Sequence, residues 1–235
     1  MLGAATIFGR PALSSSLARL FPDGVVAAEL RGWGEAKLLL PEEAIGCESF
    51  APKRLGEFAG GRACARRALS ELGHGGTLPR GADGRPVWPK GIVGSITHSD
   101  GYCAAAVASS SRIHALGLDA ERARPDRDLW PVICRPTELA WLRSLPQHAR
   151  PIAATIIFSA KEALYKCRCG LVEGWLEFHE VEIMVRWDCL RDAGSFQARL
   201  LKDYVPSGLS DRPLSGTFRL DDELVVTGIA LPSGT

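Results

Sequence analysis

The stretch Phe158-Ser-Ala-Lys-Glu-Ala-Leu-Tyr-Lys166 lies in the middle of a predicted helix over 151–169. Glu162 and Lys166 are four residues apart, so their side chains leave one face of that helix. The simplest interpretation is an exposed ion pair worth about 0.3–0.5 kcal/mol. Phe158 lies one turn earlier on the same face and places the pair at the edge of a packed surface. Lys161 projects about 100° away around the helix, where it could contact a phosphate that a metal does not cover.

A second acidic motif lies at the end of a short predicted strand over 115–120. Asp119 and Glu121 are two residues apart, so their carboxylates leave the same face of the strand. Two close carboxylates repel each other unless a cation or a proton lies between them. Oxygen ligands without a nearby His or Cys favour Mg²⁺ over zinc. An Asp-x-Glu pair alone is more often a solvated loop, but together with Glu162 and its lysines it suggests a site for phosphoryl transfer.

The remaining apolar patterns predict one further long helix and several strands. The helix covers 54–72, and Gly73 ends it. Asp100-Gly101 between two strand-like runs predicts a hairpin. The shorter elements are a helix start at 41–43, a helix at 136–144 and strands at 92–97, 102–108, 181–185, 195–201, 216–220 and 224–230. This order predicts an α+β protein with two halves, residues 1–115 and 116–235.

Composition limits the classes of partner. The chain has 235 residues, of which 46% are hydrophobic and 23% charged, as in ordinary globular proteins. Its net charge is +1, so no global field attracts it to nucleic acid or to a membrane surface. No apolar run approaches the length of a membrane span. The seven cysteines form no CxxC pair and are expected to be free in a reducing compartment, which predicts a cytoplasmic protein.

Several further motifs flank these carboxylates in a fixed order. They are Pro52–Leu69, Pro79-Arg80-Gly81, Gly84-Arg85-Pro86-Val87-Trp88-Pro89, Gly94-Ser95-Ile96-Thr97-His98-Ser99, Leu116–Glu121 and Phe158–Lys166. In this order the motifs resemble the signatures of the Sfp/EntD-type 4′-phosphopantetheinyl transferases, and most of all the EntD-like bacterial subgroup. The resemblance covers residues 52 to 166. It implies two similar α/β halves related by a pseudo-twofold axis, with the active site in the cleft between them.

The resemblance also implies catalytic roles. Asp119, Glu121 and Glu162 match the family's Mg²⁺ ligands, and the metal would bridge the pyrophosphate of coenzyme A. Glu162 would be the base that takes the proton from a carrier-protein serine. Lys161 and Lys166 would face the pyrophosphate and stabilise charge on the leaving group. The products would be the phosphopantetheinylated carrier and 3′,5′-ADP.

A third set of residues is implied to bind coenzyme A. Arginine suits phosphate oxygens because its guanidinium group can donate two parallel hydrogen bonds. The residues matched to this role are Arg54, Arg62, Arg80, Gly84, Arg85, Pro86, Thr97 and His98, together with Asp119, Lys161 and Lys166. A buried structural histidine is the alternative for His98. Arg66 and Arg67 are expected to lie on a solvated helix face.

The implied partner is an apo acyl or peptidyl carrier protein, which would present an acidic helix. Segment 122–150 mixes arginines with apolar residues and suits such a helix, although these side chains could equally pack internally. We expect a monomer. Two other functions use the same residues: a Mg²⁺-dependent phosphohydrolase acting on coenzyme A or nucleotides, and a non-catalytic coenzyme A-binding module.

Overall fold

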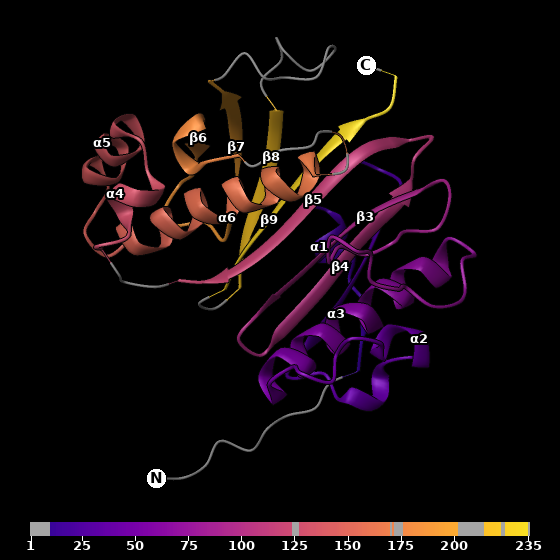
Figure 1. Ribbon diagram of the computed structural model, residues 1–235. Helices are drawn as coiled ribbons and strands as arrows, with labels where there is room; N and C mark the ends of the chain where they lie inside the picture. Colours follow the sequence, from indigo (N-terminus) through magenta and orange to yellow (C-terminus); the bar gives the residue numbers. More distant parts are fainter. Residues whose placement is uncertain are drawn as a thin grey trace, which may run out of the picture. The chain divides into compact units, whose positions relative to one another are not determined.

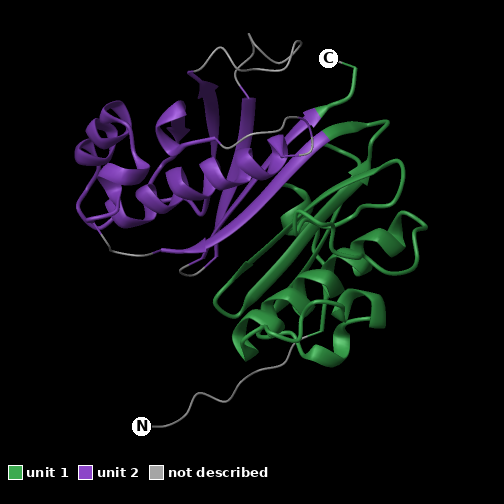
Figure 2. Ribbon diagram, in the orientation of Figure 1, with its two compact units in different colours: residues 1–114, 232–235 green, residues 115–231 purple. Residues whose placement is uncertain are grey.

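The computed structural model describes residues 10–123, 127–169, 171, 176–201, 214–221 and 224–234. The described chain contains helices and two β-sheets, so the predicted α+β class is confirmed (Figure 1). The chain forms two compact units, which Figure 2 shows in different colours. Unit 1 comprises residues 1–114 with 232–235, and unit 2 comprises residues 115–231.

Unit 1 has a four-stranded sheet in the order β1-β2-β4-β3. Its strands are β1 (Ala12–Leu13), β2 (Val25–Arg31), β3 (Ile92–Ser99) and β4 (Tyr102–Ser109). Its helices are α1 (Ser15–Ala18), the 3₁₀ turn η1 (Ala36–Leu38), α2 (Pro41–Ala44) and α3 (Pro52–Glu71). The predicted hairpin is confirmed: β3 and β4 pair antiparallel, and Gly101 in the turn between them has a φ of 71°. Strand β2 was not predicted, because its sequence Val-Val-Ala-Ala-Glu-Leu-Arg shows no alternation of polar and apolar residues.

Helix α3 lies close against the sheet of unit 1, and two glycines explain the short distance. A Cβ atom on Gly60 would lie 2.6 Å from the Sγ atom of Cys103, and one on Gly61 would lie 2.7 Å from a methyl carbon of Ile96. Glycine in a helix interior costs about 1 kcal/mol relative to alanine. The close packing offsets this cost, because it lets α3 contact both β3 and β4.

Unit 2 has a five-stranded sheet in the order β5-β9-β8-β7-β6. Its strands are β5 (Ile113–Arg122), β6 (Val181–Arg186), β7 (Ala193–Leu200), β8 (Leu214–Asp221) and β9 (Leu224–Pro232). Its helices are α4 (Trp130–Ile133), α5 (Pro136–Ser144), α6 (Arg150–Arg168) and the 3₁₀ turn η2 (Phe178–Glu180). Helix α6 crosses one face of this sheet (Figure 1), and its apolar side packs with Phe196, Phe218 and Ile229 in one core cluster.

The end of the described chain returns to unit 1. The backbone amide of Ser233 donates a 2.9 Å hydrogen bond to the carbonyl of Arg112, and its hydroxyl donates a 2.8 Å bond to the carbonyl of Ser110. These contacts explain why residues 232–235 group with unit 1. Among the described helices, none is both long enough and apolar enough to cross a bilayer.

Candidate active site

Strand β5 and helix α6 come into backbone contact at Gly117. A Cβ atom at this position would lie 1.8 Å from the carbonyl oxygen of Ala163 and 2.7 Å from the amide nitrogen of Cys167. Only glycine fits here, because both neighbours are backbone atoms of a helix. Asp119 lies two residues later on the same face of β5, so this contact brings its carboxylate next to α6.

Asp119 is buried, with an exposed fraction of 3%, and α6 supplies both of the partners described here. Its Oδ1 atom accepts a 2.6 Å hydrogen bond from Lys166 Nζ, and its Oδ2 atom accepts a 2.8 Å bond from Ser159 Oγ. The ammonium group compensates the buried charge, and the hydroxyl group fixes the orientation of the carboxylate.

Thr227 on β9 supports this arrangement and was not predicted. Its Oγ1 atom lies 2.9 Å from both the hydroxyl and the carbonyl oxygen of Ser159, and both residues are fully buried. Ser159 therefore connects Thr227 to Asp119. The only signal in the sequence is a threonine inside an otherwise apolar strand, which does not by itself reveal its partner.

Glu162 is half-buried on the same side of α6. Burial raises the pKa of Glu162, the negative charge of Asp119 raises it further, and Lys166 lowers it. A cation beside the two carboxylates would remove their repulsion, and their hard oxygen donors match Mg²⁺. Asp119 and Glu162 therefore fit the predicted metal.

The complete set of three carboxylates is not assembled as a metal cluster. Within the described ranges, no group of three or more His, Cys, Asp or Glu side chains is placed to hold an ion. Glu121 lies two residues beyond Asp119 near the end of β5 and is half-buried. Its role as a third ligand stays a prediction.

Lys161 requires a correction. The sequence predicted that it faces the pyrophosphate, but its exposed fraction is 3%. Its Nζ atom donates to Glu138 Oε2 at 2.8 Å and to the carbonyl oxygens of Ile133 and Phe178, each at 2.9 Å. An ammonium group has three donors, and all three are used inside the protein. Helical spacing placed Lys161 correctly away from Glu162 but could not show that this direction leads into the core.

A cluster of arginines surrounds two phenylalanines in unit 1. The Phe50 and Phe58 rings meet edge to face with centroids 5.6 Å apart. The guanidinium carbons of Arg54 and Arg80 lie 5.9 Å and 5.8 Å from the Phe50 centroid, and that of Arg62 lies 4.5 Å from Phe58. The structure thus brings together three residues that the sequence assigned to phosphate binding.

Arg62 has the most unusual environment of the three. Its exposed fraction is 4%, and its Nε and Nη2 atoms have no hydrogen-bond partner among the described residues. Burial lowers the pKa of Arg62 to about 10, with Arg80 and Arg66 adding to the decrease and Glu43 opposing it. A buried cation with unused donors is costly unless an anion binds to it. The cluster is therefore suited to a phosphate group.

His98 lies beside this cluster. Its Nε2 atom is 2.7 Å from Arg54 Nη1, and its Nδ1 atom is 3.5 Å from Glu57 Oε2. Because arginine can only donate, Nε2 is the acceptor, and the hydrogen of the neutral ring lies on Nδ1 toward Glu57. One third of the side chain is exposed, so His98 is not the buried structural histidine that was the alternative.

The other residues predicted to bind coenzyme A are placed differently. Gly84 has a φ of 84°, and a Cβ atom there would lie 3.1 Å from Arg80 Nη2. Arg85 is half-exposed and donates to Asp83, while Pro86 forms a β-bridge with Arg80. Thr97 is buried on the face of β3 opposite to His98, because successive side chains of a strand alternate. Their contact with a ligand stays a prediction.

Arg66 was expected on a solvated face, and this is wrong. Its guanidinium group donates to the fully buried carboxylate of Glu43 and, at 2.5 Å, to the carbonyl oxygen of Leu38. Arg67 is partly exposed and pairs with Glu71 at 2.5 Å, as a surface residue would.

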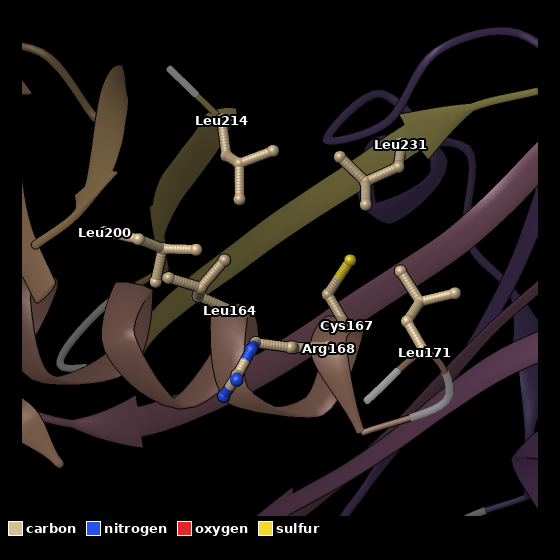
Figure 3. Close-up of a pocket in the computed structure, with 7 residues that line it drawn as sticks. All are labelled: Leu164, Cys167, Arg168, Leu171, Leu200, Leu214 and Leu231. Atoms are coloured by element: carbon tan, nitrogen blue, oxygen red, sulfur yellow. The ribbon is translucent and has the colours of Figure 1, made fainter. Parts of the chain in front are cut away.

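An apolar pocket lies at the C-terminal end of α6 (Figure 3). Leucines from α6, β7, β8 and β9 line it together with Cys167 and Arg168. With a turn of about 100° per residue, Leu164, Cys167 and Arg168 project away from Glu162. The pocket is therefore separate from the face of α6 that carries the carboxylate.

Comparison with known proteins identifies the family. Residues 40–108 match the 4′-phosphopantetheinyl transferase N-terminal domain, and residues 115–214 match the 4′-phosphopantetheinyl transferase superfamily. The chain belongs to this superfamily. The resemblance deduced from the motifs is confirmed. The first matched region contains the arginine cluster of this transferase, and the second contains Asp119 and Glu162 with their partners.

Two individual relatives match most of this chain, and a third matches half of it. The chain is 41% identical over 212 residues to the 4′-phosphopantetheinyl transferase Svp of Streptomyces mobaraensis, covering 84% of this chain and 81% of Svp. It is 36% identical over 221 residues to the 4′-phosphopantetheinyl transferase Npt of Nocardia iowensis, covering 90% and 97% of the two chains. It is also 40% identical over 124 residues to enterobactin synthase component D of Salmonella typhimurium, covering 50% of each.

Proposed function

We propose that this transferase moves the 4′-phosphopantetheine group of coenzyme A to a serine of an apo acyl or peptidyl carrier protein, releasing 3′,5′-ADP, with Mg²⁺ required. The observation that carries the proposal is the half-buried Glu162 beside Asp119 and Lys166, within a chain of this superfamily. The carboxylates supply ligands for the metal and a base, and the lysine supplies a positive charge next to them.

The proposed step is a displacement at phosphorus. The serine oxygen attacks the phosphorus atom that carries pantetheine, and the bond from this phosphorus to the bridging oxygen breaks. The bridging oxygen leaves with the electron pair as part of 3′,5′-ADP. Glu162 takes the serine proton, and Lys166 stabilises negative charge on the leaving group. Asp119, Glu162 and Glu121 would hold Mg²⁺, which neutralises charge on the pyrophosphate when bound.

The arginine cluster of unit 1 supports coenzyme A as the donor. Coenzyme A carries three phosphate groups, and Arg54, Arg62 and Arg80 present guanidinium groups around one pair of rings. The unused donors of Arg62 suit the 3′-phosphate, which other pantetheine compounds lack. The free cysteines, five of them buried, keep the cytoplasm as our predicted location, and a monomer remains the predicted state.

The decisive experiment uses the full chain with coenzyme A, Mg²⁺ and apo carrier proteins of several classes. The mass of the carrier is expected to rise by one phosphopantetheine group. Hydrolysis of coenzyme A without any carrier would favour the phosphohydrolase instead. Binding of coenzyme A without turnover, unchanged in Glu162→Gln, would favour the non-catalytic module. An unmodified carrier in every class would reject the proposal.

Replacing Arg62 with lysine is expected to weaken coenzyme A binding about tenfold to a hundredfold, because a fork of charge-assisted hydrogen bonds worth about 1.5–3 kcal/mol is lost. Calorimetric titration measures the effect. Binding of dephospho-coenzyme A should change less than threefold if Arg62 contacts the 3′-phosphate. Arg67→Lys, on the exposed side of α3, is the matched control. Equal losses for both ligands would mean that Arg62 binds another phosphate or none.

Helix α4 is the surface that we propose for the carrier protein. Leu129 and Val132 are 49% and 59% exposed, and the Arg127 guanidinium carbon lies 5.8 Å from the centroid of Trp130. Several other residues of segment 122–150 have partners within the protein, and Arg124 lies outside the described residues. Leu139 and Leu142 pack in the core cluster of unit 2, and the partly exposed Arg135 and Arg150 donate to backbone carbonyls.

Replacing Val132 with glutamate is expected to raise the KM for the carrier at least about tenfold, because an apolar contact is lost and the new charge repels an acidic helix. The KM for coenzyme A should stay the same. Leu190→Glu is the control, since Leu190 is 93% exposed in the turn between β6 and β7. A carrier KM unchanged by Val132→Glu would place docking elsewhere.

A further inference from the structure

The two units contain the same buried carboxylate arrangement. Glu43 in α2 and Glu138 in α5 are each the third residue of a short helix that begins with proline. Each accepts a hydrogen bond from the backbone amide three residues before it, from Leu40 at 3.1 Å and from Arg135 at 2.6 Å. Their exposed fractions are 0% and 2%.

The cation that meets each carboxylate also recurs at one spacing. Arg66 of α3 lies 23 residues after Glu43, and Lys161 of α6 lies 23 residues after Glu138. Each cation also donates to a backbone carbonyl 28 residues before it, that of Leu38 for Arg66 and that of Ile133 for Lys161.

The remaining oxygen of each carboxylate has the same kind of partner. Glu43 Oε1 accepts the backbone amide of Leu78 at 2.9 Å, and Glu138 Oε1 accepts that of Ile183 at 2.6 Å. We call each set of contacts a carboxylate pin. In both units the pin fastens a short helix and a following segment to the long helix.

The units differ at the next residue of the long helix. Lys161 is followed by Glu162, whereas Arg66 is followed by Arg67, which is partly exposed and pairs with Glu71. The pin is thus present in a unit that has no counterpart of the catalytic carboxylate. The contacts of the pin therefore do not require a carboxylate at the next residue.

We propose that Lys161 is a positioning residue that acts through Glu138. The pin holds the orientation of α6 so that Glu162, one residue later, faces Asp119; the consequence for transfer rests on the proposed function. All three donors of Lys161 are occupied by Glu138 and two carbonyl groups, so none is available for the pyrophosphate. Unit 1 shows that arginine can fill the equivalent place.

A double-mutant cycle with Lys161→Met and Glu138→Gln tests this proposal. Transfer to the apo carrier is measured at a temperature where every variant is fully folded. Each single variant is expected to lower kcat about a hundredfold, with a change of less than threefold in the KM for coenzyme A. The kcat of the double variant should be no lower than that of the less active single variant, because both substitutions break the same contact between Lys161 and Glu138. Lys161→Arg should restore kcat to within about tenfold of wild type.

Four outcomes would overturn the positioning role. If the fold-loss of kcat in the double variant equals the product of the two single losses, Lys161 does not act through Glu138. A large rise in the KM for coenzyme A would mean that Lys161 contacts substrate. An unchanged kcat in Lys161→Met would mean that the pin contributes to stability but not to turnover. The matched comparison is Arg66→Met, which breaks the pin of unit 1 and should lower the unfolding temperature with less than a threefold loss of kcat. An equal kcat loss there would show a general effect of instability.

Measuring the unfolding temperatures of the same four proteins separates a failure of the proposed transfer function from a failure of the positioning role of Lys161. Coupling between Lys161 and Glu138 in stability, combined with no transfer by the wild type, would reject the proposed function and leave the pin standing. Transfer by the wild type without coupling in either measurement would reject the pin alone.

Discussion

Replacing Asp119 with alanine is expected to lower kcat/KM for carrier modification at least about a thousandfold, which corresponds to about 4 kcal/mol of lost transition-state stabilisation. Two effects combine in this loss. The metal loses one of its proposed ligands, and Lys166 and Ser159 lose the acceptor that they share. The measurement is the rate of holo-carrier formation as a function of Mg²⁺ concentration.

The variants Asp119→Asn and Asp188→Asn complete this experiment. Asp119→Asn keeps the shape of the side chain and removes its charge, so it should remain inactive with an unfolding temperature closer to that of wild type than the alanine variant. Asp188 is exposed in the turn after β6, and its asparagine variant should be fully active. Full activity of Asp119→Ala at saturating Mg²⁺ would show that the metal site is elsewhere.

Replacing Gly117 with alanine is expected to destabilise the protein by at least about 3 kcal/mol. The added methyl group would lie 1.8 Å from the carbonyl oxygen of Ala163, so α6 must move away from β5. Because Glu162 is the residue before Ala163, this displacement also separates Glu162 from Asp119. Chemical unfolding measures the loss of stability. The rate of carrier modification, measured well below the unfolding temperature, shows the effect of the displacement on the site.

A matched glycine provides the control for Gly117. Gly75 is exposed, and a Cβ atom there would meet no atom within 4 Å, so Gly75→Ala should change stability by less than about 0.5 kcal/mol. Substitutions on α6 should not rescue Gly117→Ala, because the clash is with backbone atoms. A variant Gly117→Ala with normal stability and activity would contradict the close approach of β5 and α6.

Local patterns predicted most elements of the fold. The period of the apolar residues located α3 and α6, and Asp100-Gly101 located the hairpin of β3 and β4, because these signals depend only on neighbouring residues. Strand β2 was missed because its role is set by pairing with β1 and β4 rather than by its own pattern. The same limit explains why Arg66 was misjudged, since its partner Glu43 lies 23 residues away.

The sequence predicted the site correctly where both residues of a contact lie in the same short motif. Lys166 and Glu162 share one helix face, so spacing alone placed them together. Lys161 was misassigned because the sequence gives its direction around α6 but does not show whether that side of the helix is buried. Thr227 was missed because its contact with Ser159 joins residues 68 apart in the chain, and such a contact leaves no local trace.

The order of strands in unit 2 limits how early its carboxylate site can assemble during synthesis. Strand β5, which carries Asp119, neighbours β9, which comes latest in the sequence among the described strands. Until β9 has left the ribosome, β5 lacks this neighbour, and Thr227 is not yet available to support Ser159. Contacts between residues so distant in sequence form slowly. A ribosome-bound chain that ends before residue 224 should therefore be able to form the four-stranded sheet of unit 1, whereas its unit 2 cannot yet assemble the carboxylate site.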